Sequence, residues 1–149
     1  MNIWIDGDAC PKAIKQILFR AAIKRQVPLI IVANHLANTP PSPFIKRVLV
    51  EGGFDVADNY IITHAEKQDL VITADIILAD RVIENEAMAL NPRGTLYSTQ
   101  NIKQVLAMRN MNESLRNNGL IHGGMNQLNT KDIMIFSNNL DKIITQFHR

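Results

Sequence analysis

The chain has 149 residues, of which 46% are hydrophobic and 20% charged, which excludes a disordered protein and suits one domain spanning residues 1–149. Its formal net charge of +2 permits a polyanionic partner without requiring one, and its single cysteine excludes an intrachain disulfide. No apolar stretch approaches the roughly 18–20 residues that cross a bilayer, and the N-terminus lacks the regions of a signal peptide, so we expect a cytoplasmic protein with no membrane partner.

Strands and helices are expected to alternate along the first third of the chain. Residues 2–6 form a short apolar run that predicts a strand, and the periodic apolar residues after Pro11 predict a helix over 11–25. A second apolar run, residues 29–34, is typical of a buried strand. Residues 44–50 fit either a strand or a helical turn, and the pattern does not choose between them.

The same alternation is expected to continue to the end of the chain. Asp55 and Asp58 stand at the start of an apolar-periodic stretch, as acids often do in the first turn of a helix. LVITA, residues 70–74, is the clearest strand. The remaining predicted elements are a helix over about 77–90, a short strand at 95–97, a helix over 101–117 and a last helix with Thr130 as its N-cap.

Acidic residues follow two of the predicted strands. This order of elements favours an α/β fold with a mainly parallel sheet and helices on both faces, in which ligands bind off the carboxyl ends of the strands. Asp6 and Asp8 lie two residues apart at the end of the first strand, so an extended chain directs them to the same side. Thr73 and Asp75 share a side at the end of LVITA for the same reason. If the two strands are neighbours, three carboxylates converge.

Converging carboxylates repel one another unless a cation lies among them. A set of oxygen ligands suits Mg²⁺ or Mn²⁺, ions that polarise phosphoryl groups and activate water. Asp55 and Asp58 are further candidates, because a helix that follows a parallel strand begins at the same edge of the sheet. Asp69 precedes Asp75 by six residues, roughly 20 Å along a strand, so it is expected at the opposite end of the sheet.

Each candidate acid also has a structural explanation. An aspartate at a strand end is often a turn former or a helix N-cap, which applies to Asp8 and Asp75. Asp55 and Asp58 fit caps better than ligands, and Asp80 is expected to be solvated one turn into its helix.

Among the basic residues, Arg93 in a loop and Arg109 on a helix are candidate phosphate contacts, although a solvated helix face explains Arg109 equally well. Cys10 lies near a helix N-terminus, where thiols become more acidic, but a small packing residue is the favoured interpretation. The histidines have no metal-ligand spacing, and no Walker or GxGxxG motif is present.

Several stretches together resemble a known family: DGDACP, GFDVADNYI, DLVITADIILA, NPRG, LAMR and the double glycine before the last helix. They are similar, in order and along nearly the whole chain, to the YaiI/YqxD family of uncharacterised bacterial proteins. These are grouped with the PIN-like nucleases, so the resemblance implies a Rossmann-like α/β/α fold whose acids hold Mg²⁺ or Mn²⁺ and hydrolyse RNA.

Carried over to this chain, the resemblance makes Asp6 the first acid of a PIN-like site and Thr73 and Asp75 its later T-x-D. Asp8 belongs to the family's own opening motif, and Asp58 is our interpretation of the acid from a middle helix. The chain departs from the family pattern without losing a proposed ligand: Gly7 stands where Ala is expected, and Ile77 and Met125 stand where Pro is expected.

The first functional hypothesis is therefore a Mg²⁺- or Mn²⁺-dependent, ribonuclease-like hydrolase that acts on RNA or another phosphodiester. One alternative is a non-catalytic module that binds nucleic acid or protein and has a regulatory role. Another is a phosphatase of the haloacid dehalogenase type, with Asp6 as nucleophile and Asp8 as general acid. The sequence does not separate RNA from DNA or a monomer from a dimer. For the first hypothesis, the candidate catalytic residues are Asp6, Asp8, Thr73 and Asp75. The candidate metal ligands are Asp6, Asp8, Asp58 and Asp75. The candidate phosphate contacts are Arg93 and Arg109.

Overall fold

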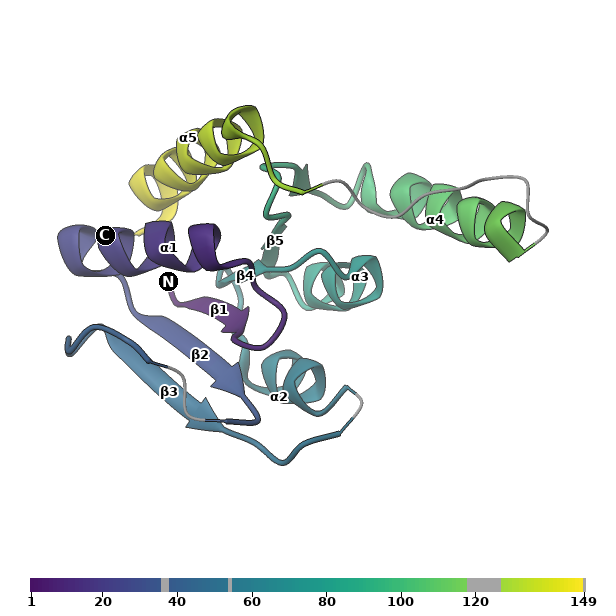
Figure 1. Ribbon diagram of the computed structural model, residues 1–149. Helices are drawn as coiled ribbons and strands as arrows, with labels where there is room; N and C mark the ends of the chain where they lie inside the picture. Colours follow the sequence, from purple (N-terminus) through teal and green to yellow (C-terminus); the bar gives the residue numbers. More distant parts are fainter. Residues whose placement is uncertain (36–37, 54, 118–126, 149) are drawn as a thin grey trace.

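The computed structural model describes residues 1–35, 38–53, 55–117 and 127–148, with the backbone alone at 109 and 112–117. Strands and helices alternate through most of the chain (Figure 1). In chain order they are β1 (Ile3–Asp6), α1 (Lys12–Arg25), β2 (Leu29–Ala33), β3 (Ile45–Leu49), α2 (Val56–His64), β4 (Leu70–Ile72), α3 (Ile76–Glu84), β5 (Met88–Leu90), β6 (Leu96–Tyr97), α4 (Ile102–Asn117) and α5 (Thr130–Phe147).

The strands form one sheet in the order β3-β2-β1-β4-β5-β6. Neighbouring strands are parallel except for β6, which runs antiparallel to β5. Ile5 of β1 lies beside Ile31 of β2 on one side and beside Ile72 of β4 on the other. β1 and β4, the strands that end in the two acidic motifs, are thus neighbours, which is the condition for their carboxylates to converge. The strand order reverses between β1 and β4, which makes their carboxyl ends the switch point where open α/β sheets bind ligands.

Side chains that alternate along the strands form two cores, one on each face of the sheet. Ile3 and Ile5 pack with α1 and α5, whereas Trp4 packs with α2 and α3 on the other face. Figure 1 shows the same division of the helices between the two faces. The predicted three-layer α/β/α fold with a mainly parallel sheet is confirmed, and the ambiguous segment 44–50 contains a strand, β3.

Two predicted boundaries are wrong. The helix expected to run to residue 90 ends at Glu84, because Glu86 adopts a left-handed conformation with φ 67° and the chain then re-enters the sheet as β5. The last helix is capped by Asn129 rather than Thr130: the Asn129 side chain accepts the Asp132 N–H, and the Asp132 side chain accepts the Asn129 N–H. This reciprocal capping box satisfies two backbone donors at once.

Asp69 is placed as expected, at the amino end of β4 and away from the switch point. Its side chain is buried and accepts three hydrogen bonds, from the N–H groups of Asn2 and Glu66 and from Nε1–H of Trp4, at 2.9 to 3.0 Å. These bonds explain how a carboxylate is accommodated inside the core. Among the helices of the described residues, none has both the length and the apolar character needed to cross a membrane.

Candidate functional site

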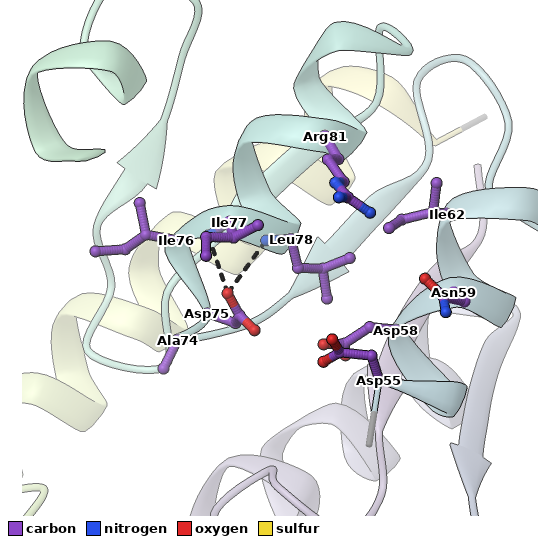
Figure 2. A pocket seen from close by; sticks show the side chains of 10 residues that line it. All are labelled: Asp55, Asp58, Asn59, Ile62, Ala74, Asp75, Ile76, Ile77, Leu78 and Arg81. Carbon is purple, nitrogen blue, oxygen red and sulfur yellow. Dashed lines mark hydrogen bonds between the residues drawn. The ribbon is translucent and has the colours of Figure 1, made fainter. Parts of the chain in front are cut away.

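A cavity of about 360 Å³ lies between α2 and α3, beside the carboxyl ends of β1 and β4. Acids from both helices line it together with aliphatic side chains, one amide and one arginine (Figure 2). Its position matches the switch point that the strand order defines. The lining residues are Asp55, Asp58, Asn59, Ile62, Ala74, Asp75, Ile76, Ile77, Leu78 and Arg81.

Asp75 is the N-cap of α3, so the structural explanation for this residue holds. One of its carboxylate oxygens, Oδ1, accepts the N–H groups of Ile77 at 2.9 Å and Leu78 at 3.2 Å. The hydroxyl of Thr73 accepts the N–H of Asp75 at 2.9 Å and fixes the turn that leads into the helix. In Figure 2 the second carboxylate oxygen of Asp75 is directed toward Asp55 and Asp58. Capping therefore uses one side of the carboxylate and leaves the other facing the cavity.

Asp58, a residue of α2, lies across the cavity from Asp75. Its pKa is raised to about 6, first because the carboxyl is partly buried, and then because Asp75, Asp6 and Asp55 place negative charge around it. A hydrogen bond between Asp58 and Asp75 favours the protonated form further. We call Asp6, Asp55, Asp58 and Asp75 the acid cluster. Asp6, Asp58 and Asp75 were predicted to be metal ligands, and Asp55, Asp58 and Asp75 line the cavity.

Asp8 is committed to a different part of the structure. Its Oδ2 accepts the N–H of Asn34 at 2.9 Å, and its Oδ1 lies 2.7 Å from Nδ1 of His35, in the loop after β2. Its own N–H donates to Oδ1 of Asp6 at 2.9 Å. Asp8 does not cap α1, which begins after Pro11 without a side-chain cap. Asp6 and Asp8 are thus linked through the backbone of Asp8, while the Asp8 carboxylate holds the neighbouring loop.

The acid cluster suits a hard cation by its chemistry. Among the described residues, no group of three or more His, Cys, Asp or Glu side chains is arranged to hold a metal ion, so the close contact is the pair Asp58 and Asp75. Mg²⁺ is usually held by one or two carboxylates, with waters and substrate phosphates as its remaining ligands. A carboxylate pair that holds a proton up to about pH 6 is compatible with this mode of binding.

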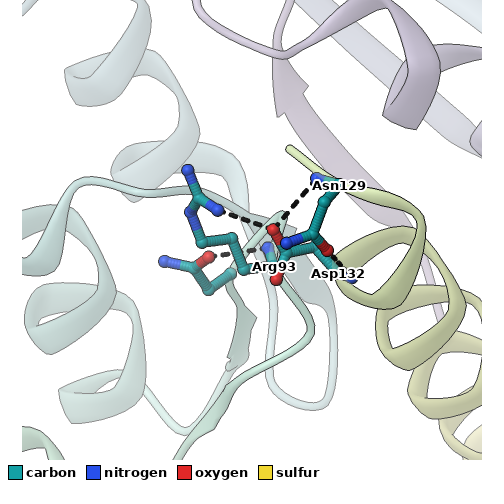
Figure 3. Close-up of polar contacts among 4 residues, drawn as sticks. Arg93, Asn129 and Asp132 are labelled. Carbon is teal, nitrogen blue, oxygen red and sulfur yellow. Dashed lines mark hydrogen bonds and ion pairs between the residues drawn. The ribbon is translucent and has the colours of Figure 1, made fainter. Parts of the chain in front are cut away.

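Arg93 does not face the cavity. Its Nη1 lies 2.6 Å from Oδ2 of Asp132, whose side chain is mostly buried in the capping box of α5 (Figure 3). This ion pair ties the loop between β5 and β6 to the start of α5. Arg93 thus has a structural partner, and its contact with phosphate stays a prediction. Arg109 lies on α4, and its side chain, like Met125, is outside the described residues.

Two other residues are placed by their immediate surroundings. Burial raises the pKa of the Cys10 thiol to about 12, and the side chain packs against the core on the α1 face, which agrees with a packing role. Asp80 is not simply solvated as expected, because its carboxylate lies 2.7 Å from Nζ of Lys103 on α4.

Sequence reasoning missed Asn59 and Arg81, which bring uncharged and positively charged donors to the cavity. Both stand at helical spacing from residues on the same walls: Asn59 is four residues after Asp55, and Arg81 is four after Ile77. That spacing was a usable signal once the two helices were known to face each other.

Comparison with known proteins agrees with the resemblance. The family described as "Uncharacterized BCR, YaiI/YqxD family" matches residues 4–146. A UPF0178 protein of Shewanella sp. strain ANA-3 is 56% identical over 141 residues, which cover 95% of this chain and 94% of the relative. A UPF0178 protein of Maridesulfovibrio salexigens is 53% identical over 146 residues, which cover 98% of this chain and 97% of the relative. No solved structure matches the chain. The chain therefore belongs to the YaiI/YqxD family.

Proposed function

We propose that this protein is a Mg²⁺- or Mn²⁺-dependent hydrolase of phosphodiester bonds, with its active site at the acid cluster. The observation that carries the proposal is the raised pKa of Asp58, which is caused first by its partial burial and then by repulsion from Asp75, Asp6 and Asp55 at the switch point. A divalent cation would remove that repulsion and replace the proton. The resemblance to PIN-like nucleases supports the same chemistry.

The roles of the residues follow from their positions. Asp58 and Asp75 would hold the metal from opposite walls, and Asp6 would add negative charge from the end of β1. Thr73 positions Asp75 through the hydrogen bond to its N–H. When bound, the cation would polarise the phosphoryl oxygens and lower the pKa of a coordinated water. The carboxyl of Asp58 is partly buried, and partial burial strengthens electrostatic interactions at this residue.

The phosphatase alternative receives less support from the structure. That chemistry requires the carboxylates of Asp6 and Asp8 to face one reacting phosphate, as nucleophile and general acid. Both oxygens of Asp8 instead contact the loop after β2, through Asn34 and His35.

The decisive experiment combines metal binding with cleavage. Titration calorimetry with Mn²⁺ would compare the wild type with Asp58→Asn and Asp75→Asn, and with Asp141→Asn as a control for an aspartate on the far face of the molecule, where it pairs with Arg25. The same samples would then be incubated with single-stranded RNA, with and without EDTA. We expect stoichiometric binding and EDTA-sensitive cleavage in the wild type and the control only.

Absence of Mn²⁺ binding to the wild type, even with RNA present, would refute the metal site. Binding without cleavage of RNA or of single-stranded DNA would refute the hydrolase while leaving the metal site intact.

A further inference from the structure

The cavity contains two polar side chains without a partner among the described residues. They are Arg81 on α3 and Asn59 on α2, and neither the guanidinium nor the side-chain amide makes a hydrogen bond or ion pair within that part of the chain. Other arginines are engaged: Arg25 pairs with Asp141, and Arg93 with Asp132. An arginine that lines a cavity without pairing to a nearby acid is available to bind an anion.

The polar groups of the cavity are arranged with opposite charges at its two ends. In Figure 2 the carboxylates of Asp55, Asp58 and Asp75 gather at one end, whereas the guanidinium of Arg81 lies at the other and is turned toward Ile62 of α2. Figure 2 also places Asn59 beside the acids on the α2 wall. A ligand that fills the cavity therefore meets the acid cluster with one group and the arginine with another.

Aliphatic side chains form much of the wall between these two ends. Ile62, Ile76 and Ile77 line the cavity, and Ile77 is exposed at its surface. Apolar walls with a few convergent polar groups are the common make-up of ligand sites. Such walls suit the sugar and base of a nucleotide, while the charged ends suit phosphates.

We propose that Arg81 binds the phosphate adjacent to the phosphodiester held at the acid cluster, and that Asn59 donates to the same backbone. The substrate is then one strand of nucleic acid, because a strand repeats a phosphate at every residue. A cavity of about 360 Å³ has the size of a small-ligand site and takes one nucleotide of a single strand, not a duplex. This inference rests on the proposed function, since it names the substrate class of the same site.

Binding is tested with a labelled single-stranded RNA and a DNA of the same sequence, by fluorescence anisotropy, in protein carrying Asp75→Asn to prevent hydrolysis. In that background Arg81→Ala is compared with Arg81→Lys, Asn59→Ala and Arg20→Ala. Arg20 is a matched control because it is an exposed arginine of α1, on the other face of the sheet.

We expect Arg81→Ala to weaken strand binding about tenfold, since one charged contact to a phosphate is lost. The slope of log affinity against log salt should fall by about 0.7, the contribution of one phosphate on a single strand. Arg81→Lys should recover part of the affinity because it keeps the charge. Asn59→Ala should weaken binding without changing the salt slope, and Arg20→Ala should have no effect.

Equal affinities of the Arg81→Ala and Arg20→Ala proteins would overturn the inference, as would a mononucleotide that binds as tightly as the strand. Failure of the proposed function gives a different pattern. Strand binding that depends on Arg81, without any cleavage by the wild-type protein, refutes the hydrolase and leaves this site standing. Cleavage with an unchanged KM in the Arg81→Ala protein refutes the Arg81 site alone.

Discussion

At the scale of single residues, Asp58 links the acid cluster to the stability of the fold. Its folded pKa of about 6 exceeds the ordinary value of 3.8 for an aspartate, so the folded state holds the proton more tightly than the unfolded state. The contribution of Asp58 to stability is therefore greatest below about pH 4, falls as the pH rises to about 6, and stays reduced above that. Ionised Asp58 is expected to cost about 1–2 kcal/mol at neutral pH, a figure lowered because the side chain is only partly buried.

Asp58→Asn should therefore raise the free energy of unfolding at pH 8 in EDTA and change it little at pH 4. Urea unfolding at the two pH values measures this, with Glu51→Gln as the control, because Glu51 is an exposed acid. A stability gain of the same size at both pH values would show that the proton on Asp58 is not its cause.

Gly7 is a second residue whose neighbours decide what the chain tolerates. A Cβ at this position would lie 2.7 Å from Cγ2 of Ile31 and 3.1 Å from Cβ of Ala33, so the alanine that the family resemblance suggests does not fit without movement. Gly7→Ala should cost about 1–3 kcal/mol through overpacking. Ile31→Leu moves the branch away from Cβ and removes the clashing methyl group.

The double variant should thus be more stable than Gly7→Ala alone, although Ile31→Leu by itself is neutral or slightly destabilising. Chemical denaturation of the wild type, both single variants and the double variant gives the coupling energy. Strictly additive effects would show that the contact between residues 7 and 31 does not limit this position.

At the scale of elements, the N-terminus of α3 combines two tasks in one side chain. The Asp75 carboxylate caps the helix with Oδ1 and faces the cavity with its other oxygen. Asparagine keeps a capping oxygen but loses the charge, whereas alanine loses both. We expect Asp75→Ala to cost about 1 kcal/mol of stability and Asp75→Asn to cost less than about 0.5, while both abolish Mn²⁺ binding. Thermal unfolding in EDTA and calorimetry separate the two effects, and Mn²⁺ binding retained by Asp75→Asn would exclude Asp75 as a ligand.

The elements also show what the sequence could and could not predict. β1 and β4 were identifiable because short apolar runs ended in Asp6 and Asp75, and a parallel sheet brings such ends to one edge. β5 was merged with the preceding helix because Met88, Ala89 and Leu90 suit either state, and the left-handed turn at Glu86 has no glycine to mark it. Residues 88–90 form a strand because they pair with β4 on one side and β6 on the other, and a short stretch of sequence does not reveal such pairing.

The site was predictable only where a motif marked it. Asp58 was proposed from its helix start, but its contact with Asp75 depends on α2 and α3 facing each other across the switch point. Asp8 belongs to the opening motif DGDACP, but its carboxylate contacts Asn34 and His35 in the loop after β2. Arg93 was predicted to be a phosphate contact, whereas its ion pair with Asp132, 39 residues away in the chain, was not predicted. Long-range partners of this kind cannot be read from spacing.

At the scale of the whole molecule, the proposed cation would join the two crossovers that meet at the switch point. α2 leads into β4, α3 leaves it, and Asp58 and Asp75 belong to these two helices, so a metal held by both carboxylates connects the walls of the cavity. A ligand that binds only the folded state stabilises it by about 2.7 kcal/mol at 100 times its Kd. For a chain of this size, saturating Mn²⁺ should raise the melting temperature by about 5–10 °C.

The pH dependence of that shift identifies the ligand. Asp58 must lose its proton before it can bind a cation, so Mn²⁺ affinity should rise with pH and level off above about 6, falling about tenfold per pH unit below that value. Binding at pH 5.5 should release protons, which calorimetry in two buffers of different ionisation enthalpy detects. Asp58→Asn should lose the thermal shift at every pH, while Asp141→Asn should keep both the shift and its pH dependence. A stabilisation by Mn²⁺ that survives Asp58→Asn would place the cation elsewhere and leave the raised pKa of Asp58 as a property of the fold alone.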